Sequence, residues 1–470
     1  MSTCAMADAT SSRLALDQAW RSLAGSPVPD LEVTGSAGLP GAFRVADAAV
    51  AAVGVALLAA APLRGVRRVA LDVPAATEAF LADRLLQIDG RPPQLWDPIA
   101  GDYRAGDGWV RLHTNYPWHR AAALRALEVA PGAGRAVVAT AVQERAALDV
   151  EDAVNEAGGA AGALRSRQGW AAHPQSAAVA DRPLVSVAPT ASRLRRAPDA
   201  ARIRVLDLTR VIAGPTATKV LAALGCDVLR LDPPGFEEVP ALVAETTAGK
   251  RCALLDIRAS GTRFGELLAA ADVLVCGLRP GALGRLGWPP ERLAQVNPGL
   301  VVAELSAYGD TGPWAGRRGF DSLVQMVTGI AAEGMERAAA DHPVPLPAQA
   351  LDHASGWLLA AGVLRALALR AEDGAGRHVG VVIARIAQWL DGLGRQAEPP
   401  PGDRLGGRPG EAEVEPSPLG EVVPSPLGGV EVVPSPLGEV TRVVFPGEFD
   451  GRRIHWAGPP ARLGSAEPRF

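Results

Sequence analysis

The sequence predicts an α/β protein with a doubly wound, mostly parallel sheet and a smaller α+β domain placed N-terminally. The first observation is the stretch 203–235, IRVLDLTRVIAGPTATKVLAALGCDVLRLDPPG, which has the pattern of a strand, a helix and a second strand. The second is that short branched apolar runs continue to alternate with helical segments as far as residue 305. This alternation is typical of a parallel sheet with helices on both faces.

The opening strand–helix–strand unit is justified residue by residue. Ile203–Leu208 is a branched apolar run that suits a strand buried on both faces. Pro215 stands where the first turn of a helix tolerates proline. An apolar stripe at helical spacing follows, formed by Ala217, Val220, Leu221 and Leu224. Gly225 is placed to end this helix, and Asp227–Leu231 is predicted to form the next strand.

The same reading extends along the large domain. It predicts strands at Cys252–Ile257, Asp272–Cys276 and Leu300–Leu305. It predicts helices at Ser260–Ala271, with Ser260 as the N-cap, and near Pro290–Val296. Because ligands of such sheets bind beyond the carboxyl ends of the strands, the following loops are the expected binding site.

The region before residue 200 contains a second set of elements. Asp107-Gly108 predicts a hairpin turn between strands at DYRA and WVRL. Ala48–Ala61 is uncharged, but its fourteen residues are too few to span a bilayer, so a buried helix is expected. The N-terminal residues lack the layout of a signal peptide. We therefore expect no membrane partner.

Residues 45–73 and 351–383 resemble each other as a weak internal repeat. Each begins near an aspartate (Asp47 and Asp352) and continues through an alanine-rich helix and a basic turn to a branched strand. Two similar helices in an alanine-rich chain explain this equally well. If the repeat is real, Asp47 marks a degenerate copy of the site at Asp352.

Composition limits the possible functions. The net charge is −4, with 47 basic and 51 acidic residues, which gives no support for nucleic-acid binding. None of the four cysteines stands at a metal-ligand spacing, and a reducing cytoplasm fits them (Cys4, Cys226, Cys252 and Cys276). We expect no metal and no permanently bound cofactor.

The C-terminal part changes character after the large domain. PSPLG occurs three times within 413–440, and this Pro/Gly-rich stretch is expected to be an extended, disordered linker. The predicted organisation has four parts. An N-terminal region that includes the small domain (1–200) is followed by a large domain (201–392), a linker (393–440) and a closing segment that returns to the fold (441–470).

The turn after the first strand distinguishes two kinds of nucleotide site. VIAGPTAT has one glycine, so the dinucleotide fingerprint G-x-G-x-x-G is missing, although Asp232 supplies an acid after the second strand. The stretch instead resembles the opening of the family III CoA-transferases (CaiB/BaiF type), which include formyl-CoA transferase, carnitine CoA-transferase and the α-methylacyl-CoA racemases. The resemblance continues in the expected order through LRPGALGRLGW, LSAYGDTGPWAGRRGFD and LDHASG.

The resemblance gives Asp352 a role. By local sequence, Asp352 precedes an apolar helix at Trp357–Leu369 and suits an N-cap. By resemblance, it is the nucleophile that takes CoA from a donor thioester and passes it to an acceptor carboxylate. With an ordinary pKa near ~3.9 it would need no base at neutral pH. Backbone N–H groups at the start of the helix would stabilise the oxyanion.

The resemblance also implies a set of residues that bind CoA. Gly277 stands where relatives carry asparagine, and Pro233 where some carry a phosphate-binding arginine. Each arginine taken alone would more often be a surface residue, because charged side chains are mostly exposed, so the arginines count only as a set. The implied contacts are Val211, Ala213, Gly214, Pro215, Gly277, Leu278, Arg279, Arg285 and Arg318.

Three functions stay open: CoA transfer, racemisation of an acyl-CoA, and CoA binding without catalysis. CoA transfer is the leading one, and its substrates would be an acyl-CoA and an organic acid. Racemases of this family carry histidine at the position of Phe320, which disfavours racemisation, although His353 or another histidine could replace it. His353 fits best as a local hydrogen-bonding partner or an exposed residue. RPPQLWDPI at 91–99 replaces the glycine-rich loop of formyl-CoA transferase, which disfavours formate and oxalate. A non-catalytic CoA-binding protein is the third function. A homodimer is a separate alternative, which concerns the partner of the chain.

Overall fold

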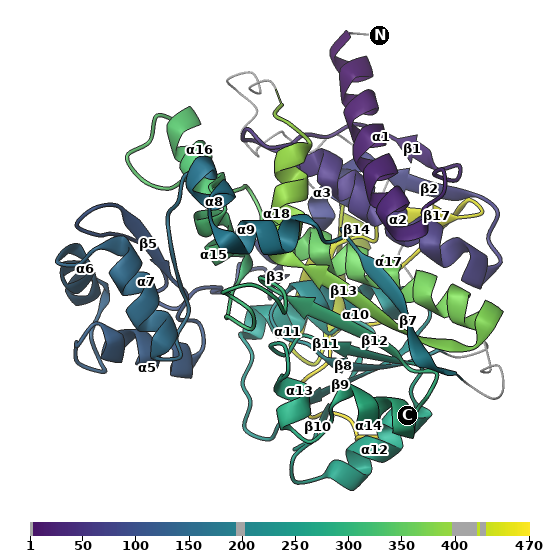
Figure 1. Ribbon diagram of the computed structural model, residues 1–470. Helices are drawn as coiled ribbons and strands as arrows, with labels where there is room; N and C mark the ends of the chain where they lie inside the picture. The colour runs from purple at the N-terminus through teal and green to yellow at the C-terminus, as the bar shows by residue number, and fades with distance from the viewer. Residues whose placement is uncertain (1–2, 194–202, 397–420, 424–428) are drawn as a thin grey trace.

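The computed structural model describes residues 3–193, 203–396, 421–423 and 429–470 (Figure 1). Its largest sheet has seven strands, all parallel to their neighbours except β7, which runs antiparallel to β13. Their order across the sheet is β10 (Arg251–Leu254), β9 (Asp227–Asp232), β8 (Arg204–Leu208), β11 (Val273–Cys276), β12 (Val301–Ser306), β13 (Ala375–Val382) and β7 (Ser186–Arg193). Counted in chain order, the parallel strands run 3-2-1-4-5-6, which is the order of dinucleotide-binding sheets and puts the topological switch between β8 and β11.

Both faces of this sheet are covered, because successive side chains of a strand point to opposite sides. Val205 and Val273 lie in the core that includes α2 (Val45–Arg64), α10 and α17. Leu206 and Leu274 pack with α12 and α14 on the other face of the sheet. The predicted doubly wound sheet is confirmed. The helices of this region are α10 (Ala213–Ala223), α11 (Pro240–Thr246), α12 (Gly261–Ala270), α13 (Ala282–Arg285), α14 (Pro290–Val296), α15 (Asp321–Val327), α16 (Ile330–Arg337), α17 (Ala350–Asp373) and α18 (Ile383–Gly392).

The expected helix ends are partly confirmed. The apolar stripe of α10 is buried, and Gly225 follows the helix with a φ of +92°, a conformation that suits glycine. Ser260 stands at the N-cap of α12, but its side chain accepts no capping hydrogen bond. Its φ of −114° and ψ of 42° differ from the extended geometry that lets a serine oxygen reach the first turn.

The N-terminal region packs on the same core as the large domain. α1 (Thr3–Ala24) and α17 both contact α2 (Val45–Arg64), which is followed by β2 (Val69–Asp72), α3 (Val73–Ala79), α4 (Ala82–Leu85) and β3 (Gln87–Ile88). Strand β2 pairs with β1 (Glu32–Thr34) and with β17 (Gly447–Phe449), which pairs with β18 (Arg452–Arg453). By length and composition α2 and α17 could cross a membrane, but 94% and 78% of their apolar windows are buried inside the protein.

The proposed repeat has a structural counterpart. α2–β2–α3 and α17–β13–α18 share the order helix, strand, helix, and Asp47 and Asp352 are each the third residue of their helix. Asp47 accepts hydrogen bonds from Ser11, Ser12 and Arg44, and it is therefore engaged by its neighbours.

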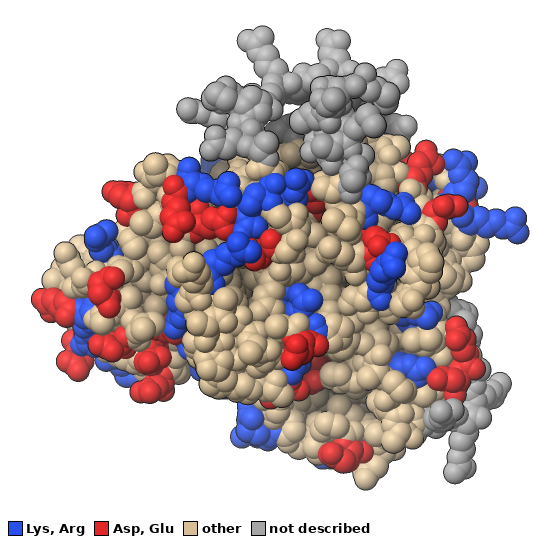
Figure 2. All heavy atoms as spheres, turned by 45° about the horizontal axis from the view of Figure 1, so that its top comes forward, with Lys and Arg blue, Asp and Glu red and all other residues tan. Residues whose placement is uncertain are grey.

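The small domain projects to one side of the sheet body, at the left of Figure 1, and has a hydrophobic core of its own. The expected hairpin is confirmed, with Arg104 opposite Trp109. The elements are β4 (Gly101–Arg104), β5 (Trp109–Leu112), α5 (Pro117–Ala126), α6 (Arg135–Gln143), α7 (Ala147–Glu156) and β6 (Ala161–Ala163), followed by α8 (Arg167–Ala171) and α9 (Pro174–Ala180). On the face drawn in Figure 2, acidic and basic side chains are interspersed.

The structure corrects part of the expected linker. Segments 397–420 and 424–428 lie outside the described residues, but β15 (Val430–Ser435) and β16 (Gly438–Val443) form an antiparallel hairpin between β14 (Glu421–Val423) and β3. Val433 and Val440 pack against Leu86 from the N-terminal region. The alternating valines therefore outweigh the Pro/Gly-rich composition, and Pro434 lies beyond the residues that pair with β14.

Candidate active site

A cavity of about 30 Å³ lies between the sheet body and the small domain. This volume is enough for only one or two small groups, so a group placed there lies close to every wall. Three regions of the sequence that lie far apart contribute to it: the N-terminal region, the small domain and the large domain. The lining residues are Asp83, Leu95, Trp96, His113, Asn115, Val211, Ile212, Leu242, Phe320, Asp321, Gln349 and Asp352.

Asp352 lies inside the first turn of α17 and is 5% exposed. The expectation that it precedes the helix is wrong, because α17 begins at Ala350 and its N-cap is Gln349. Asp321, at the start of α15, takes over capping: its Oδ2 accepts a 2.9 Å hydrogen bond from the backbone N–H of Asp352. The carboxylate of Asp352 accepts no hydrogen bond from the rest of the described chain and faces the cavity.

Three carboxyl groups share this small cavity. The pKa of Asp352 is raised well above its ordinary value, first by burial and then by the negative charges of Asp321 and Asp83. Burial also raises the pKa of Asp321 to about 6. The expectation of an ordinary, fully ionised Asp352 is therefore wrong. Carboxylates that line one buried cavity do not all ionise together, so burial and the neighbouring charges favour the protonated form of Asp352.

His353 is buried, and its Nε2 lies 3.2 Å from Oδ1 of Asp83. This confirms the expected hydrogen-bonding role and excludes the exposed position. This contact joins α17 to the N-terminal region. His353, the residue after Asp352, thereby holds Asp83 at the cavity. Asp83 itself carried no signal in the sequence, because it lies in a short helix without a motif.

The turn after β8 brings Val211 to the cavity in a strained conformation. Its φ is +68°, which is an outlier for a β-branched residue. The backbone N–H of Val211 donates to Oε2 of Glu238 at 3.0 Å, and the Tyr116 hydroxyl donates to Oε1 of the same carboxylate at 2.7 Å. Strain of this kind costs roughly 1–3 kcal/mol and persists where neighbours hold it. Glu238 thus ties the turn to the small domain.

A buried ion pair between Lys250 and Asp207 contacts both ends of the turn after β8. Lys250 Nζ donates to Oδ2 of Asp207 at 3.0 Å and to the carbonyl oxygen of Pro215 at 2.9 Å. Oδ1 of Asp207 accepts the N–H of Thr209 at 2.9 Å. Both charged side chains have no exposed surface. The pair therefore links the end of β8 to the first turn of α10.

The close approach of α10 and α17 fixes Asp352 relative to this turn. A Cβ atom added to Gly356 would lie 2.6 Å from the carbonyl oxygen of Ala213 and 2.7 Å from Cβ of Thr216. Only a glycine allows the two helices to meet at this point, one helical turn after Asp352.

The residues expected to bind CoA are divided between two places. Val211 lines the cavity, and Ala213, Gly214 and Pro215 are buried at the start of α10. Gly277, Arg279 and Arg285 are exposed, while Leu278 and Arg318 are half-buried. The positive charge of Arg279 lowers the pKa of Arg318, after burial, so these two guanidinium groups are neighbours. Neither forms a hydrogen bond or ion pair with another residue in the described part of the chain, which leaves both free for an anion.

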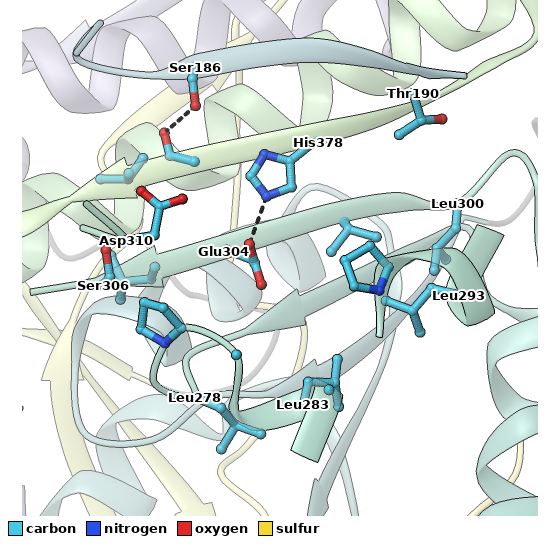
Figure 3. A pocket seen from close by; sticks show the side chains of 18 of the residues that line it. Ser186, Thr190, Leu278, Leu283, Leu293, Leu300, Glu304, Ser306, Asp310 and His378 are labelled. Atoms are coloured by element: carbon cyan, nitrogen blue, oxygen red, sulfur yellow. Dashed lines mark hydrogen bonds and ion pairs between the residues drawn. The ribbon is translucent and has the colours of Figure 1, made fainter. Parts of the chain in front are cut away.

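The loop after β11 also borders a second and larger pocket of about 560 Å³. In Figure 3, Leu278 and Leu283 face strands β12 and β13, where Glu304 pairs with His378 at 2.7 Å. This pocket includes neither Asp352 nor the 211–215 turn. The two loops follow adjacent strands and touch, because a Cβ atom added to Gly277 would lie 3.4 Å from Cα of Thr209. Arg279 and Arg318 also lie near the small domain, since their charges, after burial, lower the pKa of His119.

Sequence reasoning did not identify the small-domain side of the cavity. His113 and Asn115 come directly after β5, and polar residues at the end of a strand were the signal available. Phe320 lines the cavity, and His113 stacks on its ring with centroids 3.5 Å apart. No group of three or more metal-ligating side chains gathers within the described residues.

Comparison with known proteins agrees with these motifs. The model of CoA-transferase family III matches residues 201–403. A probable fatty acyl-CoA transferase of Mycobacterium tuberculosis is 34% identical over 40% of this chain and 51% of its own length. An acetyl-CoA:oxalate CoA-transferase of Acetobacter aceti is 33% identical over 38% of this chain and 49% of its own length. The chain thus spans about half the length of these curated relatives.

A crystal structure of the Mycobacterium tuberculosis protein covers 40% of this chain and 54% of its own chain, with 34% identity and a TM-score of 0.37. The matched region begins with the β8–α10–β9 unit and includes Arg279, Arg318, Phe320 and Asp352. Residues 201–403, which contain the large domain, therefore match the model of CoA-transferase family III.

Proposed function

We propose that this chain transfers CoA between an acyl-CoA and a carboxylic acid, with Asp352 as the covalent carrier. The observation that carries the proposal is the state of this one side chain. It is buried at the start of α17, its backbone is held by Asp321, and its carboxylate accepts no hydrogen bond from other described residues. A buried carboxylate without a structural partner costs free energy, which suits a group retained for chemistry.

The reaction needs no group beyond the two substrates and this carboxylate. The ionised Asp352 attacks the donor carbonyl, a C–O bond forms, and the C–S bond breaks with its electron pair leaving on the CoA thiolate. The thiolate then attacks the aspartyl carbonyl, releases the first acid and leaves an aspartyl-CoA thioester. An acceptor carboxylate reverses these steps and takes CoA away.

The positions of the arginines support CoA as the group carried. Arg279 and Arg318 are adjacent and have no partner in the described chain, so two phosphate oxygens could be bound by each guanidinium. Arg285 is the last residue of α13, the short helix that follows the loop carrying Arg279. The names of the relatives make fatty acyl and acetyl donors the first substrates to test. A formyl donor and an oxalate acceptor, which the segment 91–99 disfavours, are the comparison.

The test is to incubate the protein with each acyl-CoA, trap it with hydroxylamine or borohydride, and map the adduct by mass spectrometry. The adduct is expected on Asp352 and is expected to be absent in Asp352→Asn. Asp47→Asn is the matched control, because Asp47 has the same place in α2 but is bound by Ser11, Ser12 and Arg44. Absence of any adduct on Asp352 with every donor would contradict the proposal.

Isomerisation at the α-carbon of an acyl-CoA is the second candidate, and His113 is the observation that favours it. Its imidazole lies against Phe320 in the same cavity as Asp352. Loss of deuterium from an α-deuterated acyl-CoA without an acceptor acid would support this function. Tight CoA binding in calorimetry, with neither transfer nor exchange, would instead indicate a non-catalytic CoA-binding protein.

A further inference from the structure

Acyl transfer, if the proposed function is correct, needs a hydrogen-bond donor in this cavity for the negative charge that develops during the reaction. Attack on the thioester carbonyl puts negative charge on its oxygen, and enzymes of this type meet that charge with fixed N–H groups. The sequence favoured the start of the helix after Asp352 as their source. In the structure these N–H groups are not free, because Asp321 accepts from the backbone of Asp352 and also of Leu351.

His113 supplies a donor from the small domain. It is 4% exposed, it lines the cavity that contains Asp352, and its Nδ1 atom has no hydrogen-bond partner among the described residues. A buried polar atom without a partner is costly and is rarely kept without a use. The neighbouring amide of Asn115 is already engaged, because Oδ1 accepts from Asp97 and Nδ2 donates to Leu95.

The ring of His113 is held rigidly on three sides. Phe320 stacks on it with a centroid distance of 3.5 Å and an interplanar angle of 3°. Trp96 and His119 meet it edge-on, with centroids at 5.9 Å and 6.4 Å. A donor that is fixed before the substrate arrives does not have to reorganise during the reaction, and this is the property that makes such groups effective.

The ring is also kept uncharged. Burial, with smaller effects from His119 and Arg111, lowers the pKa of His113 to about 3. A neutral imidazole carries one N–H donor and one acceptor nitrogen. It can therefore donate to a carbonyl oxygen without forming a fixed ion pair with the carboxylates that line the same cavity, Asp83, Asp321 and Asp352.

We infer that His113 is a catalytic residue of this site, whose N–H donates a hydrogen bond to the acyl carbonyl oxygen while Asp352 attacks the carbon. The proton stays on the imidazole throughout. As the C–O bond to Asp352 forms, the π electron pair of the carbonyl moves to its oxygen. It returns to re-form the C=O bond as the C–S bond breaks, and the bonding pair of the C–S bond leaves on the thiolate. The ligand is an acyl thioester, and both His113 and Asp352 line the small cavity in which its carbonyl would lie.

The experiment compares His113→Phe with His113→Gln and His113→Asn. Phenylalanine keeps an aromatic ring against Phe320 but removes the N–H, whereas the two amides keep a donor near one or the other ring nitrogen. Single-turnover release of CoA thiol is expected to fall about 10²-fold in His113→Phe, with at least tenfold recovery in one amide variant. His378→Phe, in the separate pocket, is the control and is expected to retain the wild-type rate.

A second readout does not depend on turnover. The probe is a ketone analogue of acetyl-CoA in which a methylene replaces the thioester sulfur, labelled with ¹³C at the carbonyl. Its carbonyl resonance is expected to move downfield on binding to the wild type and to the rescuing amide variant, but not to His113→Phe. If the wild type shows this shift but transfers no CoA, the contact stands and the proposed function fails.

Three results would overturn the inference. One is a wild-type turnover rate together with an unchanged carbonyl shift in His113→Phe. Another is a loss in all three variants without rescue, at unchanged melting temperature. The third is α-deuterium exchange that requires His113, because that would make the imidazole a proton carrier. If His113→Phe does not fold, the comparison of the two amide variants with the wild type decides the question.

Discussion

The backbone N–H of Asp352 donates a 2.9 Å hydrogen bond to Oδ2 of Asp321. This bond holds the first turn of α17 in place and also puts a second carboxyl group beside the proposed nucleophile. Asp321 therefore has two opposite effects: its hydrogen bond fixes the position of Asp352, and its charge raises the pKa of Asp352. Each effect can be tested separately.

Asp321→Asn is expected to shift the pH dependence of acyl transfer. The Asn side-chain oxygen can still accept the N–H of Asp352, but the negative charge is lost. In the proposed reaction Asp352 attacks only when it is ionised, so its raised pKa would make the rate rise with pH. Removing the charge lowers that pKa, so the rising limb should move by roughly one unit toward acid. Single-turnover release of CoA thiol from pH 4 to 9 measures this shift, and an unmoved limb would contradict the assignment of Asp352 as the titrating nucleophile.

The same substitution is expected to stabilise the fold at neutral pH. The pKa of Asp321 rises from 3.8 to about 6 on folding, so the stability it contributes is full below pH 3.8 and is lost as the pH rises through 6. An amide has no such dependence. The variant should gain on the order of 3 kcal/mol over the wild type by pH 7, and the difference should shrink toward pH 4. Urea denaturation across this range tests it, and a pH-independent difference would count against it.

Lys250→Met is expected to lower the free energy of unfolding by about 3–5 kcal/mol, because it leaves Asp207 as a buried charge without its partner. Replacing both residues, as Lys250→Met with Asp207→Leu, should recover much of this loss. Thermal melting of the single and double variants gives the comparison. A double variant no more stable than the single one would show that the other bonds of Asp207, to Thr209 and Thr218, matter more than the ion pair.

Arg279→Gln and Arg318→Gln are each expected to raise the KM for acyl-CoA about tenfold or more, with a smaller change in kcat, because a charge-assisted hydrogen bond to a phosphate contributes about 1.5–3 kcal/mol. The exposed Arg258, far along the chain from both, is the control, and Arg258→Gln should leave KM unchanged. Dephospho-CoA esters would show which phosphate is bound. An unchanged KM in both variants would remove these arginines from the site.

Gly356→Ala is expected to reduce both stability and transfer. The added Cβ would press on the carbonyl oxygen of Ala213 at 2.6 Å, which pushes α17 from α10 and costs about 1–3 kcal/mol. Gly392→Ala is the matched control in α18, where a Cβ meets nothing within 4 Å, and it should be neutral or stabilising by up to about 1 kcal/mol. Melting temperatures and single-turnover rates of the two variants are to be compared. Equal behaviour would contradict the close approach of the helices.

The sequence by itself determined the sheet. Strands such as Ile203–Leu208 and helices such as 213–223 follow from the local spacing of apolar residues. This spacing is a property of the segment itself and does not depend on distant parts of the chain. The sequence also placed Asp352 at the start of a helix in the right neighbourhood, although the helix begins earlier than the apolar run suggested. Local pattern could not place the C-terminal hairpin, where alternating valines are hidden in a Pro/Gly-rich repeat.

Only the tertiary structure decided the chemistry of the site. Asp83, His113 and Asp352 come from three separate regions, and no spacing in the sequence relates them. Their burial in one cavity is what raises the pKa of Asp352 and lowers that of His113, because desolvation and nearby charge depend on the fold and not on the residue type. A carboxylate that would be ordinary in water thus becomes the group on which the proposed reaction depends.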